Sequence, residues 1–208
     1  QEQAEKIVLH TKAKLFDSSI GGYHLNTNYG KVLTNMGRAF GFAYNHKENG
    51  AVFSHMVMMY AYGLYEYNLV NDARRAAFRV LKQGQKEDSQ VLVGIPEYFS
   101  NKGHGKYSYL TGSASWLLLL LRKHIFGLEF NLGRLTLNPK LTKEDFINYR
   151  ASIITNIFNK PVKITYYNPK DLDYGYYQIK EIYINKQLTS MPIKKINGNV
   201  EVHLDEIV

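Results

Sequence analysis

The sequence predicts an α+β protein in which helices come first and strands follow. Three apolar or amphipathic runs lie between residues 51 and 126, and short β-branched and aromatic runs fill the chain after Pro139. Of the 208 residues, 45% are hydrophobic and 21% are charged, which is the composition of an ordinary globular protein. A chain of this length can bury one good core or two small ones.

The helical part is expected to contain three helices. Residues 51–69 (AVFSHMVMMYAYGLYEYNL) are apolar almost all round, which is typical of a buried helix. Residues 71–83 (NDARRAAFRVLKQ) are amphipathic and stop at Gly84, and residues 113–126 (SASWLLLLLRKHIF) stop at Gly127. The first of these helices is therefore expected to be buried and the second to lie with one face toward the core.

Two stretches read as loops. Residues 84–111 are rich in Gly, Pro and Tyr, and a loop of that length in a compact domain is usually functional. The first 45 residues show little sign of regular structure, so we expect an opening loop and a chain that starts within a longer protein.

The pattern after residue 138 predicts a small antiparallel β unit. Its runs are TNIFNKPVKITYYN, YYQIKEIYIN and NVEVHLDEIV, with Asn197-Gly198 as a turn signal between the last two. We therefore divide the chain into a helical domain at 1–138 and a β domain at 139–208.

Composition limits the partners and the compartment. The net charge of +8 is spread along the chain, and no recognised nucleic-acid motif accompanies it, so we expect no nucleic acid. The absence of cysteine excludes disulfides and thiolate metal sites and agrees with a reducing compartment. The longest apolar run, Trp116 to Leu121, is far below the roughly 20 residues that span a bilayer. The N-terminus has no signal pattern, so a cytoplasmic protein without a membrane partner is expected.

The stretch HKENGAVFSH, residues 46–55, gathers ionisable groups before the first buried helix. The spacing of His46 and His55 matches no standard zinc motif, so no metal site is predicted. If Asn49 or Gly50 caps a helix that begins at Ala51, Lys47 and Glu48 precede the helix and His55 lies just over one turn into it. His55 is then either a satisfied core histidine or, because helix N-termini favour anions, a ligand for phosphate or sugar.

The stretch GKYSYLTGSASW, residues 105–116, allows the same two interpretations. Thr111 is placed to cap the third helix, and its hydroxyl with the N–H groups of Gly112 and Ser113 would also make a small anion cradle. Gly112 has no side chain, so a ligand can approach its backbone closely. Tyrosines 98, 107 and 109 precede this motif and suit a sugar site or an aromatic core equally.

Together, NTNYG…MGRAFGFAYNHKENGAVFSHMVMMYA and GIPEYFSNKGHGKYSYLTGSASW closely resemble the inverting disaccharide phosphorylases of glycoside hydrolase family 94. That family includes cellobiose, chitobiose and laminaribiose phosphorylases and enzymes acting on β-1,2-glucans. The resemblance is to the C-terminal part of the catalytic domain. It implies the last helices of an (α/α)6 barrel followed by a small jelly-roll-like β domain.

The resemblance also implies a reaction. Inorganic phosphate, the co-substrate, attacks the anomeric carbon of a β-linked gluco-disaccharide or oligosaccharide and gives α-glucose 1-phosphate, with no other cofactor. His55, Thr111 and Gly112 would contact the phosphate, and Lys47 and Glu48 would contact the sugar. The family's general acid is an aspartate in a motif that is absent here, so no catalytic residue is assigned in this chain. The chain alone is expected to be inactive.

Other functions stay open. Glu48 and Glu97 are the best-placed carboxylates, and neither is assigned as the acid. A non-catalytic carbohydrate-binding fragment would keep the aromatic loop, and the phosphorylase-like end of a cyclic β-1,2-glucan synthase would share the motifs. Members of the family often dimerise, so a homodimer is compatible with the full-length enzyme. The glycosidic linkage is not specified by these residues.

Overall fold

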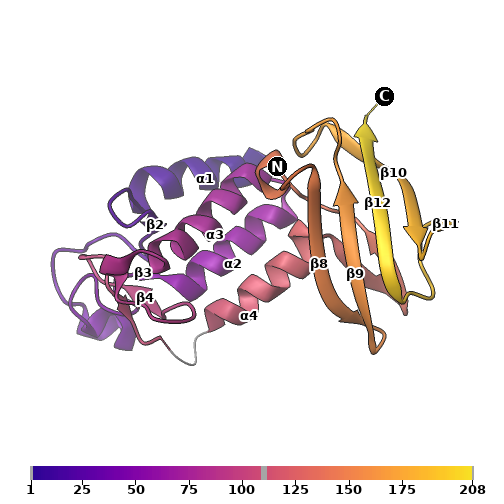
Figure 1. Cartoon of the computed structure of the whole chain (residues 1–208). Helices are drawn as coiled ribbons and strands as arrows, with labels where there is room; N and C mark the ends of the chain where they lie inside the picture. The colour runs from indigo at the N-terminus through magenta and orange to yellow at the C-terminus, as the bar shows by residue number, and fades with distance from the viewer. Residues whose placement is uncertain (1, 109–111, 208) are drawn as a thin grey trace. The chain divides into compact units, whose positions relative to one another are not determined.

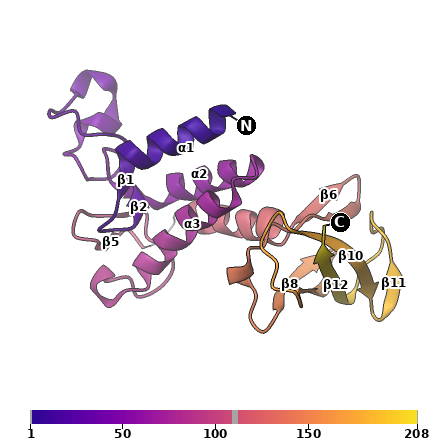
Figure 2. The same cartoon turned by 90° about the horizontal axis from the view of Figure 1, so that it is seen from above.

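The computed structural model describes residues 2–108 and 112–207 and is an α+β protein, as predicted (Figures 1 and 2). Its helices precede a strand-rich part. The chain divides into two compact units, Gln1–Leu120 and Leu121–Val208. The hairpin formed by residues 128–137 groups with the second unit, so the compact division falls before the position where the sequence places its domain boundary.

The first unit contains helices, 3-10 turns and very short strands. In chain order they are α1 (Glu2–Leu15), β1 (Phe16–Asp17), β2 (Gly22–Tyr23), η1 (Thr34–Met36), η2 (Arg38–Gly41), β3 (Val52–Phe53), α2 (Ser54–Glu66), α3 (Val70–Gly84), η3 (Glu87–Ser89), β4 (Tyr98–Phe99), β5 (Gly105–Lys106) and α4 (Gly112–Leu119).

The opening segment is not a loop throughout, because α1 is a helix of 14 residues, and the expectation for the first 45 residues is wrong there. Val8 is its one buried residue, so the helix lacks the apolar stripe that signals an amphipathic helix. Its charges have the order that a helix favours, with Glu2 and Glu5 in the first turn and Lys12 and Lys14 in the last.

Helix α2 begins later than predicted. Val52 and Phe53 form strand β3, which pairs with β4 in a three-stranded sheet of order β3-β4-β5. The Ser54 N–H then donates to the Glu97 carbonyl at 2.8 Å, so the sheet leads directly into the helix. The helix is therefore not capped by Asn49 or Gly50, and its N-cap is Phe53.

Helix α3 has the predicted amphipathic character. Ala73, Ala76, Ala77 and Val80 recur at helical spacing and are buried, and their small side chains allow close packing against α2. Helix α4 also packs on α2, and the two helices lie side by side in Figure 1.

The second unit is built on one five-stranded sheet and a hairpin. Its elements are β6 (Leu128–Asn131), β7 (Arg134–Leu137), η5 (Lys143–Asp145), β8 (Arg150–Ile157), β9 (Lys160–Tyr167), β10 (Tyr177–Ile184), β11 (Gln187–Thr189) and β12 (Gly198–Glu206). A π-helical turn, η4 (Leu120–Ile125), comes before them in the chain.

The sheet order is β11-β10-β12-β9-β8. All neighbouring pairs are antiparallel except β12 and β9, which are parallel, so the predicted purely antiparallel unit is wrong in this one pairing. The chain leaves β9, forms β10 and β11, and returns as β12, and this long connection makes a parallel pair geometrically accessible. Figure 1 shows β12 lying between β9 and β10.

The first predicted β run contains a turn. Phe158 and Asn159 both have positive φ, 51° and 60°, between the paired residues Ile157 and Lys160. A two-residue loop with positive φ at both positions joins antiparallel strands tightly, so this run forms a hairpin of β8 and β9. Within residues 2–108 and 112–207, no helix combines the length and the apolar character needed to cross a bilayer.

Candidate functional site

Two asparagines hold the KENG segment in place. Asn49 is buried, and its side-chain Nδ2 donates to the Phe42 carbonyl at 2.6 Å. Asn26 donates through Nδ2 to Asn49 Oδ1 at 3.1 Å and accepts the Gly50 N–H at 2.9 Å. Asn49 was predicted as a helix cap, so its place in this clamp, and that of Asn26, is a finding of the structure.

Lys47 reaches the segment that precedes the TGS motif. Its Nζ lies 4.5 Å from the ring centroid of Tyr107 and 5.7 Å from that of Phe42. Lys47 and Tyr107 have positive φ values of 48° and 54°, which are uncommon for residues with a side chain. The structure thus brings Lys47 and the loop of residues 84–108 together.

Glu48 offers an unused acceptor. Its Oε2 atom is buried, and no hydrogen-bond partner for it is found in the described part of the chain. A buried carboxylate oxygen without a donor is costly, and a ligand hydroxyl would satisfy it. Glu97, the other well-placed carboxylate in the sequence, contributes through its backbone: its carbonyl accepts the Ser54 N–H, and its N–H bonds to the carbonyls of Lys106 and Tyr107.

The His55 ring lies against Gly112. A Cβ atom added at Gly112 would fall 2.5 Å from Cε1, 2.8 Å from Nδ1 and 2.9 Å from Nε2 of this imidazole. His55 is the second residue of α2, in its first turn and not beyond it, and Gly112 is the first residue of α4. The starts of two helices, separated by more than fifty residues of sequence, therefore meet at one imidazole.

Trp116, on α4, packs its ring near the rings of two residues of α2, His55 and Tyr62. The Trp116 ring lies 6.3 Å from that of His55 and 5.2 Å from that of Tyr62, measured between centroids. A satisfied core histidine would bond through a ring nitrogen, but no described residue makes a hydrogen bond with the half-buried ring of His55. The ring nitrogens can therefore serve a ligand. Thr111, predicted as the third phosphate contact, lies outside the described residues.

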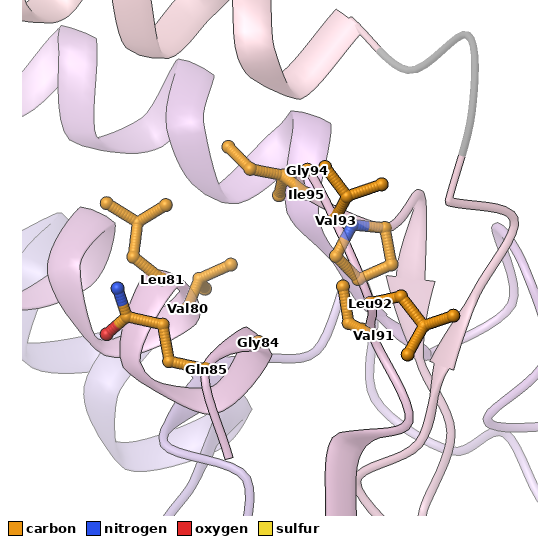
Figure 3. A pocket seen from close by; sticks show the side chains of 10 residues that line it. Val80, Leu81, Gly84, Gln85, Val91, Leu92, Val93, Gly94 and Ile95 are labelled. Atoms are coloured by element: carbon orange, nitrogen blue, oxygen red, sulfur yellow. The ribbon is translucent and has the colours of Figure 1, made fainter. Parts of the chain in front are cut away.

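A pocket at the C-terminal end of α3 is separate from the candidate site. It has a volume of about 410 Å³, and it lies between the C-terminal turn of α3 and residues 91–96 (Figure 3). Its labelled side chains are aliphatic apart from Gln85. None of Lys47, Glu48, His55 and Gly112 lines it, so it does not belong to the candidate site.

Within residues 2–108 and 112–207, no group of three or more His, Asp or Glu side chains gathers at one point. The candidate residues are the His55 ring against the start of α4, an acceptor at Glu48 without a partner among the described residues, and a cation at Lys47 over Tyr107. The imidazole can donate to an anion, and the carboxylate can accept from a hydroxylated ligand.

Comparison with known proteins gives no family for this chain. No protein-family model matches the sequence, and no curated protein matches it.

Proposed function

We propose that the chain provides the phosphate- and sugar-binding part of an inverting β-glycoside phosphorylase, a glycosyltransferase that uses phosphate to cleave β-linked glucosides. The observation that supports this most directly is the contact of His55 with Gly112 at the starts of α2 and α4. In this proposal the helices belong to an (α/α)6 barrel, and the β domain is the jelly-roll-like domain that follows it.

The phosphate side of the site is made of donors. Helix starts carry N–H groups without partners inside the helix and a partial positive charge, so they attract a dianion. The N–H of Ser54 is occupied by Glu97, which leaves the ring nitrogens of His55 and the N–H of Gly112 as the proposed phosphate contacts. Because Gly112 has no Cβ, the His55 ring can lie directly against the start of α4, which makes the two proposed contacts neighbours.

The sugar side is made of one acceptor and one cation. The buried Oε2 of Glu48 would accept a sugar hydroxyl, and Lys47 would donate to a ring or hydroxyl oxygen. The Asn26–Asn49 clamp fixes the backbone that carries both. Preorganised contacts of this kind reduce the entropy lost when two reactants are held together.

In the proposed reaction, a phosphate oxygen attacks the anomeric carbon on the face opposite the glycosidic oxygen. The bond from that carbon to the leaving oxygen breaks, and a carboxylic acid donates its proton to this oxygen. Phosphate is already a nucleophile, so no general base is needed. Neither Glu48 nor Glu97 is proposed as the acid, and the chain by itself is expected to show no turnover.

Calorimetric titration of the 208-residue chain with phosphate tests the proposal. His55→Ala removes one charge-assisted donor, worth about 1.5–3 kcal/mol, and should weaken phosphate binding about 10- to 100-fold. His46→Ala is the matched control, because His46 is an exposed histidine in the same segment. Unchanged phosphate affinity in His55→Ala would refute the assignment of His55 as a phosphate contact. Phosphorolysis of cellobiose, laminaribiose or sophorose by the chain alone would refute the expectation that the chain lacks the general acid.

A non-catalytic sugar-binding function is the second candidate. It is supported by a row of aromatic rings, in which Phe53 stacks on Tyr98 at 6.4 Å and Tyr98 lies 6.1 Å from Tyr107, which is 43% exposed. Titration with oligosaccharides separates the two functions. Sugar binding that strengthens with phosphate favours the phosphorylase or the related β-1,2-glucan synthase, whereas binding indifferent to phosphate favours the non-catalytic function.

A further inference from the structure

A second pocket in the first unit is lined with positive charge. It has a volume of about 270 Å³ and lies between the turn that joins β1 to β2 and one face of α3. We call it the α3 pocket; it is formed by Phe16, residues 18–21, Arg79, residues 82–83 and Lys86. It shares no residue with the site of Lys47, Glu48, His55 and Gly112.

Three cations line the α3 pocket, and no carboxylate does. Arg79 and Lys82 are three residues apart on α3, and Lys86 follows the C-terminus of this helix. None of the three has an ion-pair partner in the described part of the chain. Their charges repel one another at short range, so an anion bound between them would relieve this repulsion.

Arg79 is held in position before any ligand binds. Its guanidinium carbon lies 4.9 Å from the centroid of the Phe16 ring, which is a cation–π contact. The turn packs on the same side chain, because a Cβ atom at Gly21 would lie 3.7 Å from Cβ of Arg79. A stacked arginine loses less freedom on binding an anion than a free one, and its planar donors match a phosphate group.

The negative end of α3 does not oppose an anion strongly. The Gly84 carbonyl accepts a hydrogen bond from Ser89 Oγ at 3.0 Å, and the Gln83 carbonyl accepts the Lys86 N–H at 3.2 Å. Asp17, next to the pocket in sequence, accepts the N–H and hydroxyl of Ser19 through one carboxylate oxygen. These groups are thus occupied by donors of their own.

Gln83 distinguishes the pocket from a simple basic surface. Its side chain is only 3% exposed, and Nε2 donates to the Gly103 carbonyl at 3.0 Å. Its Oε1 atom is buried and has no hydrogen-bond partner among the described residues. This amide oxygen requires a donor, which a deprotonated phosphoryl oxygen cannot supply and a hydroxyl group can.

We propose that the α3 pocket binds a small phosphate monoester that carries hydroxyl groups, such as a sugar phosphate. Arg79, Lys82 and Lys86 bind the phosphate, and Gln83 Oε1 accepts a hydroxyl. The volume lies just below the range of about 300–1,000 Å³ that is typical of small-molecule pockets, which suits a ligand of this size. The proposal does not depend on the phosphorylase function.

Calorimetric titration of the 208-residue chain with glucose 6-phosphate, at constant ionic strength, tests whether the α3 pocket binds a phosphate monoester. The phosphate of this probe is not on the anomeric carbon, so the probe is not the product of the proposed phosphorolysis. The double substitution Arg79→Gln with Lys82→Gln should weaken binding at least about tenfold, by the loss of two charged donors. Arg75→Gln is the matched control, because Arg75 lies on the same helix, pairs with Asp72 and does not line the pocket.

Three further results are expected. His55→Ala should leave the affinity for glucose 6-phosphate unchanged, and this variant should bind the ester more tightly than inorganic phosphate. Circular dichroism should show that each variant is folded; if the double variant is not, Lys82→Gln with Lys86→Gln replaces it.

The proposal is overturned if the double variant binds normally, or if Arg75→Gln weakens binding as much, since net charge would then explain the effect. It is also overturned if His55→Ala abolishes binding, because the probe would then occupy the other site. Equal affinity of the His55→Ala variant for glucose 6-phosphate and inorganic phosphate would exclude the contact with Gln83.

Discussion

Replacing Gly112 with alanine tests whether the position of the His55 ring matters for phosphate binding independently of the stability of α4. The new Cβ would lie 2.5 Å from Cε1 of His55, whereas ordinary contact begins at 3.4 Å, so the ring must move by about 0.9 Å. The atoms that it meets are at the end of the His55 side chain, which can rotate away from the helix. The backbone of Gly112 is helical, so the substitution brings no strain of its own.

The expected effects on stability and on binding have opposite signs. Alanine favours the helix over glycine by about 1 kcal/mol, so the free energy of unfolding should rise by up to that amount, less the effect of moving the imidazole. Phosphate binding should fall about 10- to 100-fold, because a misplacement near 1 Å removes one charge-assisted hydrogen bond. A loss of binding in a protein of equal or higher stability cannot be attributed to unfolding.

Gly63→Ala is the matched control. Gly63 lies within α2, and a Cβ atom there would meet nothing within 4 Å. This variant should gain helix stability and keep its phosphate affinity. Urea unfolding gives the stabilities, and calorimetric titration with phosphate gives the affinities. Gly112→Ala with unchanged affinity would refute the idea that His55 and Gly112 form one anion site.

Two further predictions concern buried side chains whose hydrogen bonds stabilise each of the two units. Asn49→Ala should lower the free energy of unfolding by about 1–3 kcal/mol in urea, because the Phe42 carbonyl and the Asn26 amide lose their partner; a loss below about 0.5 kcal/mol would show that the clamp is dispensable. In the second unit, burial raises the pKa of Tyr166 and Tyr177 far above the usual value near 10. Their stabilising contribution is complete below pH 10 and is lost above it, by about 1.4 kcal/mol per pH unit for each tyrosine. Tyr177→Phe should remove the contribution of one tyrosine from the slope of unfolding free energy against pH above about pH 10. At neutral pH it should lower the free energy of unfolding by about 1–3 kcal/mol, because the N–H and carbonyl of Leu141 lose their hydrogen bonds to the hydroxyl. An unchanged slope in alkaline unfolding experiments would contradict this prediction.

The elements that the sequence predicts well are those whose own residues define a buried face. Helix α3 shows a strong helical period, and the strands of the second unit are β-branched and alternate. Helix α1 has one buried residue and therefore no period to detect. Strand β3 was assigned to a helix because its two residues are as apolar as the helix that follows, and its pairing with β4 depends on residues far along the chain.

The same reasoning explains which parts of the site were found. Lys47, Glu48 and His55 are neighbours in sequence, so a local motif contains them. The clamp of Asn26 and Asn49 joins residues 23 positions apart, and no local pattern distinguishes a clamping asparagine from a capping one. The contact of His55 with Gly112 is also non-local, and only the resemblance predicts that these two residues act together.

The chemistry of the two ligands accounts for the mixture of groups at this site. Phosphate accepts hydrogen bonds, and the ring of His55, one of the donors proposed for it, makes no hydrogen bond with any described residue. A sugar mainly offers hydroxyl donors, and the buried Oε2 of Glu48 is an acceptor without a donor. A folded chain that leaves both kinds of group unpaired forgoes stability at each of them. Phosphate alone would satisfy the donors and leave Glu48 unpaired, and a sugar alone would satisfy Glu48 and leave the donors unpaired. In the proposed function, phosphate would satisfy the donors and the sugar would satisfy the acceptor, and phosphorolysis of a glycoside requires both ligands.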